Sequence, residues 1–138
     1  MHRPAPGVTD RLAPYTHPME PVTGIGGYFL RAEDPAAQTA WYRDVLGLDL
    51  DHHGLWQQPA GPTVVAFFEQ DTDYFGDHTQ GSMLNFRVAD LDAKLAELRE
   101  AGAHVDEKTE EMVGVGRFGW VHDPEGNRIE LWESADEG

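Results

Sequence analysis

The sequence contains the same pattern twice: an alternating segment, an aspartate, and a helix that ends near a glycine. Leu-Arg-Ala-Glu-Asp at residues 30–34 aligns with Phe-Arg-Val-Ala-Asp at residues 86–90, an offset of 56 positions. In both copies the aspartate is suited to the N-cap, where its carboxylate accepts from free backbone N–H groups. Because there are only two copies, the pattern indicates a duplicated supersecondary unit and not a solenoid.

The predicted helices follow directly after the two aspartates. Pro35 favours the first helical position of the first helix, because its missing N–H costs nothing there. Gly47 and Gly102 are typical helix-ending residues. Apolar residues recur at helical spacing in both segments. They are Ala37, Trp41, Val45 and Leu48 in the first helix, and Leu91, Leu95 and Leu98 in the second.

Short alternating segments surround each helix and predict strands. We expect them at residues 27–32, 48–58 and 62–70 in the first copy, and at 83–88, 104–112, 117–122 and 127–133 in the second. The expected fold class is α+β. Two βαβββ modules, at about 22–76 and 82–133, would form a curled mixed sheet around a cup, with the helices outside. Residues 1–21 carry five prolines and read as an N-terminal arm, which leaves 22–138 as a single domain.

The closing stretch combines a tight turn with an amphipathic strand. In Asp-Pro-Glu-Gly-Asn at residues 123–127, proline presets φ and glycine supplies a positive-φ position. Ile129 and Leu131 then alternate with polar and aromatic side chains, among them Glu130. A carboxylate in the middle of such a strand either lines a pocket or, in an ordinary hairpin, lies in solvent.

Composition excludes several classes of function. Ten basic residues against 25 acidic ones give a net charge of -15, which argues against nucleic acid or an anionic membrane as partner. With no cysteine, the chain has no thiolate nucleophile or thiolate metal site. We see neither an apolar run of about 18 residues nor the apolar core of a signal peptide. We therefore expect a cytoplasmic protein of bacterial type.

Several motifs together resemble the vicinal oxygen chelate superfamily. They are the duplicated unit, Trp-Tyr-Arg-Asp-Val-Leu-Gly-Leu at 41–48, Val-Ala-Asp-Leu-Asp at 88–92, and the closing stretch at 123–133. That superfamily contains glyoxalase I, extradiol dioxygenases, fosfomycin-resistance proteins and bleomycin-binding proteins. The segments at 71–76 and 116–120 further resemble a bacterial glyoxalase-like subgroup. The resemblance implies a small-molecule cup, and it implies a homodimer because such modules commonly pair across chains.

The same resemblance allows the family's metal positions to be checked. Glu130 matches the carboxylate on the last strand. Gly27 and Met83 stand where metalloenzymes of the superfamily carry histidines, and Ala66 stands near the additional glutamate of glyoxalase I. These three residues offer no ligand for Zn, Ni, Fe or Mn. We therefore expect no catalytic metal and no other cofactor, and the alternative is a divalent ion at Glu130 with unexpected ligands.

The histidines do not restore such a centre in this interpretation. His52 and His53 are consecutive on a predicted strand, so their side chains should point to opposite faces. His122 precedes the turn and could share a face with Glu130. Two ligands are too few for a stable site, so a hydrogen-bonded or exposed histidine is expected.

Strand alternation predicts which side chains line the cup. If the last hairpin pairs Trp120 with Glu130, Phe118 and His122 join that face. Arg31 and Arg87 occupy equivalent places in the two copies, where they either anchor an anion or carbonyl or form an ion pair with an acid such as Glu130. The predicted pocket residues are Phe29, Arg31, Met83, Asn85, Arg87, Trp120, His122, Arg128, Glu130 and Trp132.

Three hypotheses follow from these residues. The first is a metal-independent protein that binds a small, partly aromatic molecule, like the bleomycin-resistance proteins. The second is a lyase or dioxygenase of the superfamily, which uses Glu130 with unexpected metal ligands or runs metal-free acid–base chemistry with Glu130, His122 or Tyr74. The third is a scaffold or regulatory protein whose cup is filled and inert.

Overall fold

The computed structural model describes residues 19–77 and 79–135. The chain divides into two compact units, residues 1–30 and residues 31–138. Within the first unit, residues 19–30 are irregular and exposed. The predicted proline-rich arm lies outside the described residues except for 19–21. In the second unit, no helix of the described residues is long and apolar enough to cross a membrane.

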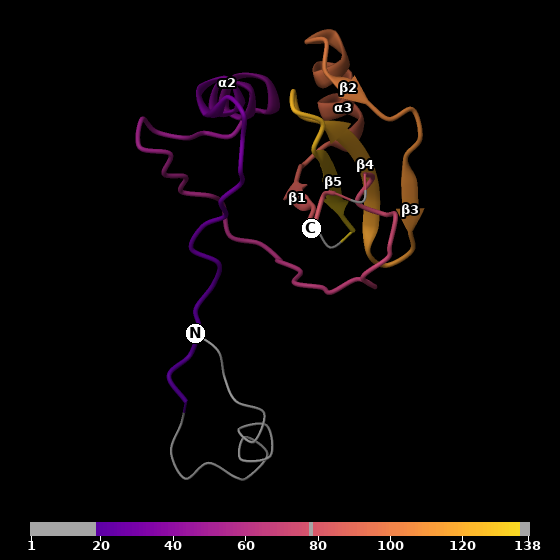
Figure 1. Cartoon of the computed structure of the whole chain (residues 1–138). Helices are drawn as coiled ribbons and strands as arrows, with labels where there is room; N and C mark the ends of the chain where they lie inside the picture. The colour runs from indigo at the N-terminus through magenta and orange to yellow at the C-terminus, as the bar shows by residue number, and fades with distance from the viewer. Residues whose placement is uncertain (1–18, 78, 136–138) are drawn as a thin grey trace. The chain divides into compact units, whose positions relative to one another are not determined.

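A five-stranded mixed sheet forms the centre of the second unit (Figure 1). Its strands are β1 (Leu84–Arg87), β2 (His104–Val105), β3 (Glu110–Met112), β4 (Gly116–His122) and β5 (Arg128–Ser134). The order is β1-β5-β4-β2, with β3 also paired to β4. β1 runs parallel to β5 and the other pairs are antiparallel. The predicted α+β class is confirmed, as are the strands expected at 83–88, 117–122 and 127–133. The single strand expected at 104–112 is wrong, because irregular residues 106–109 separate β2 from β3 there.

The core lies between one face of this sheet and helix α3 (Leu91–Glu100). Val121, Ile129 and Leu131 project from β4 and β5 and are at most 1% exposed. They meet the predicted leucine stripe of α3, namely Leu91, Leu95 and Leu98. A Cβ added at Gly119 would lie 3.1 Å from a methyl group of Leu95, so glycine permits the close approach of the helix.

Both predicted helix starts are confirmed. α2 (Pro35–Trp41) begins after Asp34, whose Oδ1 accepts from the backbone N of Ala37 at 3.1 Å. Asp90 caps α3 in the same way through the backbone N of Ala93, at 3.0 Å. α2 continues as a short π-helical turn, η1 (Tyr42–Leu46), which ends at the expected glycine with φ of 100°. Leu46 of η1 is buried in the core of α3 and the sheet.

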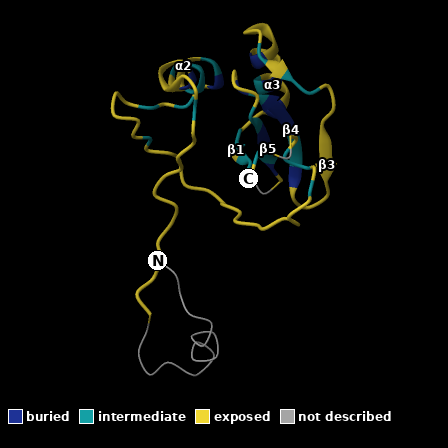
Figure 2. Cartoon of the chain, in the orientation of Figure 1, coloured by how far each residue is buried: buried dark blue, intermediate teal, exposed yellow. Residues whose placement is uncertain are grey.

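The strands predicted in the first half are not formed. Residues 27–32, 48–58 and 62–70 contain no strand, and Phe29 and Phe67 are 94% and 95% exposed. Figure 2 shows these segments as mostly exposed, whereas β4 and β5 are largely buried. Alternation measures how well a segment suits a pleated surface, but a strand also needs a hydrogen-bonding neighbour. The prediction for His52 and His53 is also wrong: they lie in a turn and their rings are 3.9 Å apart.

The predicted turn at 123–127 is confirmed, and it is also the joint between the two halves of the second unit. Its i→i+3 bond joins Gly126 N to the carbonyl of Asp123 at 2.9 Å, and Gly126 has φ of 89°. The buried carboxylate of Asp123 accepts from Gln38 Nε2 at 2.9 Å and from the Tyr42 hydroxyl at 2.7 Å. Helices α2 and η1 are thereby held to the turn between β4 and β5.

Candidate functional site

The sheet face opposite α3 gathers the polar and aromatic side chains of β1, β4 and β5. Trp120 pairs with Glu130, and His122 with Arg128, in the β4–β5 register. Asn85 is the partner of Glu130 across the β1–β5 pair. Because directly opposed residues project to the same side of a sheet, these five side chains share one face. The predicted pairing of Trp120 with Glu130 is therefore confirmed.

Glu130 is the centre of this face. Its carboxylate accepts from the Tyr74 hydroxyl at 2.5 Å and from Asn85 Nδ2 at 2.7 Å, one donor to each oxygen. Only 8% of the residue is exposed, so the hairpin alternative with Glu130 in solvent is wrong. Burial and the bond to Glu130 both raise the pKa of Tyr74, which keeps its phenol protonated as a donor.

The side chains at the superfamily's metal positions do not fit a divalent ion. Gly27, Ala66 and Met83 provide no nitrogen or oxygen ligand. The one carboxylate at these positions, Glu130, already accepts one hydrogen bond on each oxygen. These residues therefore do not provide the ligand set of the superfamily's metal centre.

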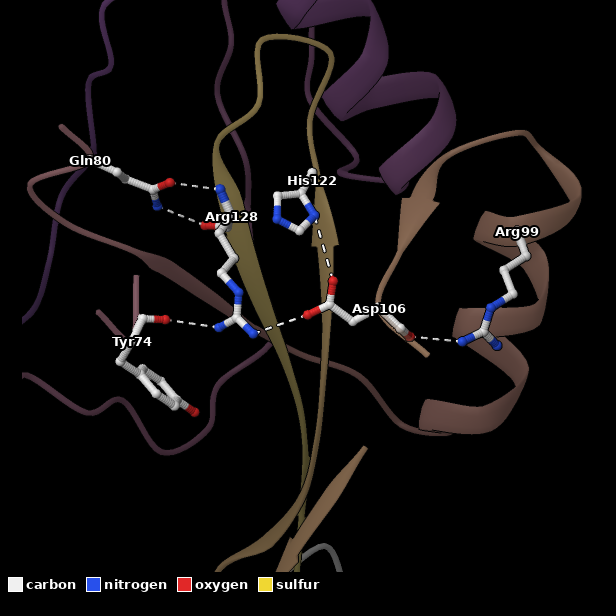
Figure 3. Close-up of polar contacts among 6 residues, drawn as sticks. All are labelled: Tyr74, Gln80, Arg99, Asp106, His122 and Arg128. Atoms are coloured by element: carbon white, nitrogen blue, oxygen red, sulfur yellow. Dashed lines mark hydrogen bonds and ion pairs between the residues drawn. The ribbon is translucent and has the colours of Figure 1, made fainter. Parts of the chain in front are cut away.

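Arg128 connects this centre to the edge of the sheet (Figure 3). Its guanidinium donates to the carbonyl of Tyr74 at 2.9 Å and to Asp106 Oδ2 at 3.0 Å. The same group lies 4.8 Å from the centroid of the Trp120 ring, within range of a cation–π interaction. The side-chain amide of Gln80 bonds both the N and the O of Arg128, at 2.8 and 2.9 Å, which fixes its backbone.

A hollow of about 310 Å³ opens beside Trp120 and Arg128. The Trp120 and Tyr74 rings meet edge to face, with centroids 6.2 Å apart. Trp120 is 3% exposed, and its Nε1 has no hydrogen-bond partner among the described residues. A buried donor left unpaired costs free energy, about 1–3 kcal/mol. The lining residues are Asp73, Tyr74, Asp106, Lys108, Glu110, Trp120 and Arg128.

His104, Asp106 and His122 form a second polar group at the β2–β4 edge. The two imidazoles stack with centroids 4.4 Å apart, and His122 Nδ1 lies 3.8 Å from Asp106 Oδ1. Burial lowers the pKa of His122 and outweighs the attraction of Asp106, so the neutral ring is favoured. A hollow of about 640 Å³ lies on this side, lined in part by His104, His122 and Trp41.

The structure brings together seven of the ten predicted pocket residues on one sheet face and places Phe29, Arg31 and Met83 differently. Phe29 belongs to the first unit and Arg31 is exposed. Met83 is half-buried just before β1, and Arg87 donates to the carbonyl of Pro59 at 3.2 Å. The Glu130 carboxylate accepts hydrogen bonds from Tyr74 and Asn85, and not from Arg87 as one hypothesis predicted. The seven residues on the shared face are Asn85, Arg87, Trp120, His122, Arg128, Glu130 and Trp132.

Sequence reasoning missed His104, Asp106 and Gln80, and it named Tyr74 only as an acid–base candidate of the alternative function. His104 and Asp106 alternate around Val105, and the pairing of His104 with His122 puts them on the pocket face. The face on which His104 and Asp106 lie can be predicted only once the β2–β4 register is known. Tyr74 and Gln80 lie in an irregular loop, where no periodicity indicates direction.

A curled, five-stranded mixed sheet with few helices is consistent with the glyoxalase fold. The sequence matches the glyoxalase-like domain family over residues 28–132, and this chain belongs to that family. No curated protein matches the sequence.

Solved structures with the same fold come from several bacteria. TnmS3, an antibiotic binding protein from Streptomyces sp. CB03234, is 24% identical with a TM-score of 0.56, over 85% of this chain and 100% of its own. A glyoxalase/bleomycin resistance protein/dioxygenase superfamily member from Sphaerobacter thermophilus is 20% identical with a TM-score of 0.55, over 82% and 98%. A lactoylglutathione lyase from Agrobacterium tumefaciens is 24% identical with a TM-score of 0.52, over 86% and 98%.

Proposed function

We propose that this protein binds a small, partly aromatic molecule on the sheet face opposite α3, without a catalytic metal at the superfamily's position. The observation that carries the proposal is Trp120, which lines the 310 Å³ hollow and whose buried indole N–H has no hydrogen-bond partner among the described residues. Ligand pockets typically combine apolar and aromatic walls with a few fixed polar groups. A ligand carbonyl or hydroxyl would accept from this N–H and remove its desolvation cost.

The surrounding groups suit the same class of ligand. The Tyr74 and Trp120 rings offer aromatic area, while Arg128 and Lys108 offer cationic donors. Arg128 is held by Asp106 and the carbonyl of Tyr74, so its position is set before a ligand arrives. Each oxygen of the Glu130 carboxylate already accepts a hydrogen bond, which supports a pocket without a metal. The antibiotic-binding description of TnmS3 agrees with this proposal, although the likeness itself concerns the fold.

A thermal-shift screen with aromatic antibiotics and small carbonyl compounds tests the proposal. A ligand that binds only the folded state raises the melting temperature, and at 100 times its Kd it adds about 2.7 kcal/mol of stability. Trp120→Phe keeps a ring and removes the N–H. We expect a two- to tenfold loss of affinity, since a neutral hydrogen bond contributes about 0.5–1.5 kcal/mol.

Trp56→Phe is the matched control, because Trp56 contacts Phe86 and does not line the hollow. Its affinity should equal that of the wild type. Binding that survives Trp120→Phe unchanged would contradict the proposed pocket, and a panel without any stabilising compound would contradict the proposed ligand class.

We further propose a homodimer formed through the exposed apolar side chains of residues 55–68. Val64 and Val65 are 70% and 69% exposed, and Phe67 is 95% exposed. β1 stands at the end of the sheet order, with β5 as its strand neighbour among the described residues. An exposed apolar segment and a sheet edge together are typical of an interface.

Light scattering during size-exclusion chromatography tests the dimer. The double variant Val65→Ser and Phe67→Ser should raise the dissociation constant at least about tenfold, because two apolar side chains leave the interface. Val113→Ser, at a second-half site that is 93% exposed, should leave the dimer intact. A monomeric wild type, or equal effects at both sites, would refute this interface.

A further inference from the structure

We propose that His104, Asp106 and His122 form a binding site for one divalent transition-metal ion, separate from the superfamily's metal position. Nitrogen atoms of the two histidines and a carboxylate oxygen all lie within 4.8 Å of one another. Two imidazoles and one carboxylate suit Zn²⁺, Co²⁺ or Ni²⁺. Glu130, Gly27, Ala66 and Met83 take no part, although Asp106 also lines the 310 Å³ hollow of the proposed pocket.

The backbone places the three donors on one edge of the sheet. His104 is the direct cross-strand partner of His122. Asp106 follows two residues after His104, and its N–H donates to the carbonyl of Trp120 at 2.9 Å. Residues two apart on a strand project to the same face. The β2–β4 register therefore places His104 and His122, and the backbone bond to Trp120 places Asp106 directly after the end of β2.

Contacts around Asp106 leave one of its oxygens for an ion. Arg128 occupies Oδ2 at 3.0 Å, while Oδ1 faces His122 Nδ1 at 3.8 Å. Arg99 donates to the carbonyl of Asp106 at 2.9 Å and fixes its backbone (Figure 3). Partners of this kind orient a ligating carboxylate in known metal sites. The nearby guanidinium charge opposes a cation, so moderate affinity is expected.

Each imidazole can contribute a ring nitrogen to an ion, and the His104 ring can rotate toward it. His122 Nδ1 is buried and has no hydrogen-bond partner among the described residues. Zinc–nitrogen bonds are about 2.1 Å, so donors around one tetrahedral ion lie roughly 3.4 Å apart. Rotation of the exposed His104 ring can close the remaining separation. Three protein donors leave a position open, and the 640 Å³ hollow beside His104 and His122 would hold a water or a ligand oxygen there.

Titration of the full, chelator-treated chain with Co²⁺ or Zn²⁺ alone tests the site, by visible absorption for cobalt and calorimetry for zinc. We expect one such ion per chain. His104→Gln and Asp106→Asn should each weaken binding by at least about 100-fold, since even outer-shell changes cost 10–100-fold. Both side chains are at least partly exposed, and circular dichroism checks that each variant folds.

Two controls make the outcome decisive. The double variant His52→Gln and His53→Gln removes another adjacent imidazole pair of the described residues, whose rings are 3.9 Å apart, and should leave the affinity unchanged. Glu130→Gln should also leave it unchanged. No ion uptake by the wild type, or a loss caused by the His52 and His53 variant instead, would overturn the site. A loss caused by Glu130→Gln would overturn it too, and would also contradict the metal-free pocket.

Discussion

The two sequence repeats share the same local helix signals but form different structures. Both contain an aspartate-capped helix that ends near a glycine, and both helices form. The second repeat also forms a sheet with a closed core, whereas the alternating segments of the first repeat remain irregular and exposed. Helix signals are local because caps and apolar spacing act within a few residues. Strands depend on a partner, which the first repeat lacks within the described residues.

The largest expected effect separates the core of the second repeat from the exposed segments of the first. Leu131→Ala removes a fully buried side chain between β5 and α3, so it should lower the free energy of unfolding by about 2–5 kcal/mol. Val64→Ala, at a 70% exposed site, should change the same quantity by less than about 0.5 kcal/mol. Urea denaturation of the dilute protein measures both. Comparable losses would mean that the first repeat is packed as tightly as the second.

The next effect concerns Asp123, which joins the repeats. Burial raises the pKa of Asp123, but the hydrogen bonds from Asn127, Tyr42 and Gln38 together outweigh it and lower that pKa. Its stabilisation is therefore fully present above the unfolded value near 3.9 and is lost as the pH falls through the lowered native value. Asp123→Asn should cost about 1.5–3 kcal/mol at neutral pH, as for hydrogen bonds to a charged group.

Melting temperatures between pH 3 and pH 7 measure this dependence. The difference between wild type and Asp123→Asn should shrink toward the acidic end, where the wild-type carboxyl takes up a proton. A difference that stays constant over this range would show that the charge of Asp123 does not stabilise the joint.

The helix caps provide a smaller and more symmetrical test. Asp34→Ala and Asp90→Ala each remove one acceptor for a helical N–H, and each should cost about 1 kcal/mol of helix stability. Hydrogen exchange followed by NMR should show the loss at α2 for Asp34 and at α3 for Asp90. If α2 opens locally, so that its amide hydrogens exchange without unfolding of the sheet, the loss of protection caused by Asp34→Ala will stay confined to that helix. An equal global effect would instead show that both helices unfold with the sheet.

The smallest effect is expected at the Arg43–Asp44 ion pair. The pair is exposed and the two residues are adjacent in sequence. The Asp44 hydrogen bond raises the pKa of Arg43, but solvent screens such pairs and their contribution to folding is small. Arg43→Ala should leave the melting temperature unchanged within error in a thermal scan. A clear drop in the melting temperature would indicate that Arg43 makes a contact in the first repeat that stabilises the fold.

These contrasts explain how much was readable from the sequence. Asp34, Asp90 and the turn at 123–127 carried local signals, and their structures were predicted correctly. The face shared by Trp120 and Glu130 followed from one correct pairing. Tyr74 and Gln80 were not predictable as partners of the last strand, because a loop gives no direction to its side chains. Asp106 and His104 required the β2–β4 register, which alternation alone does not fix.

The most direct test of the proposed pocket is the indole N–H resonance of Trp120, assigned with the Trp120→Phe variant, during titration with a stabilising aromatic compound. If the ligand accepts a hydrogen bond from this buried group, the resonance should move downfield and saturate with the same Kd as the thermal shift. The bonded indole N–H of Trp132, which donates to the carbonyl of Val115 at 3.0 Å, should move far less. Saturable binding with the Trp120 resonance unmoved would contradict the account.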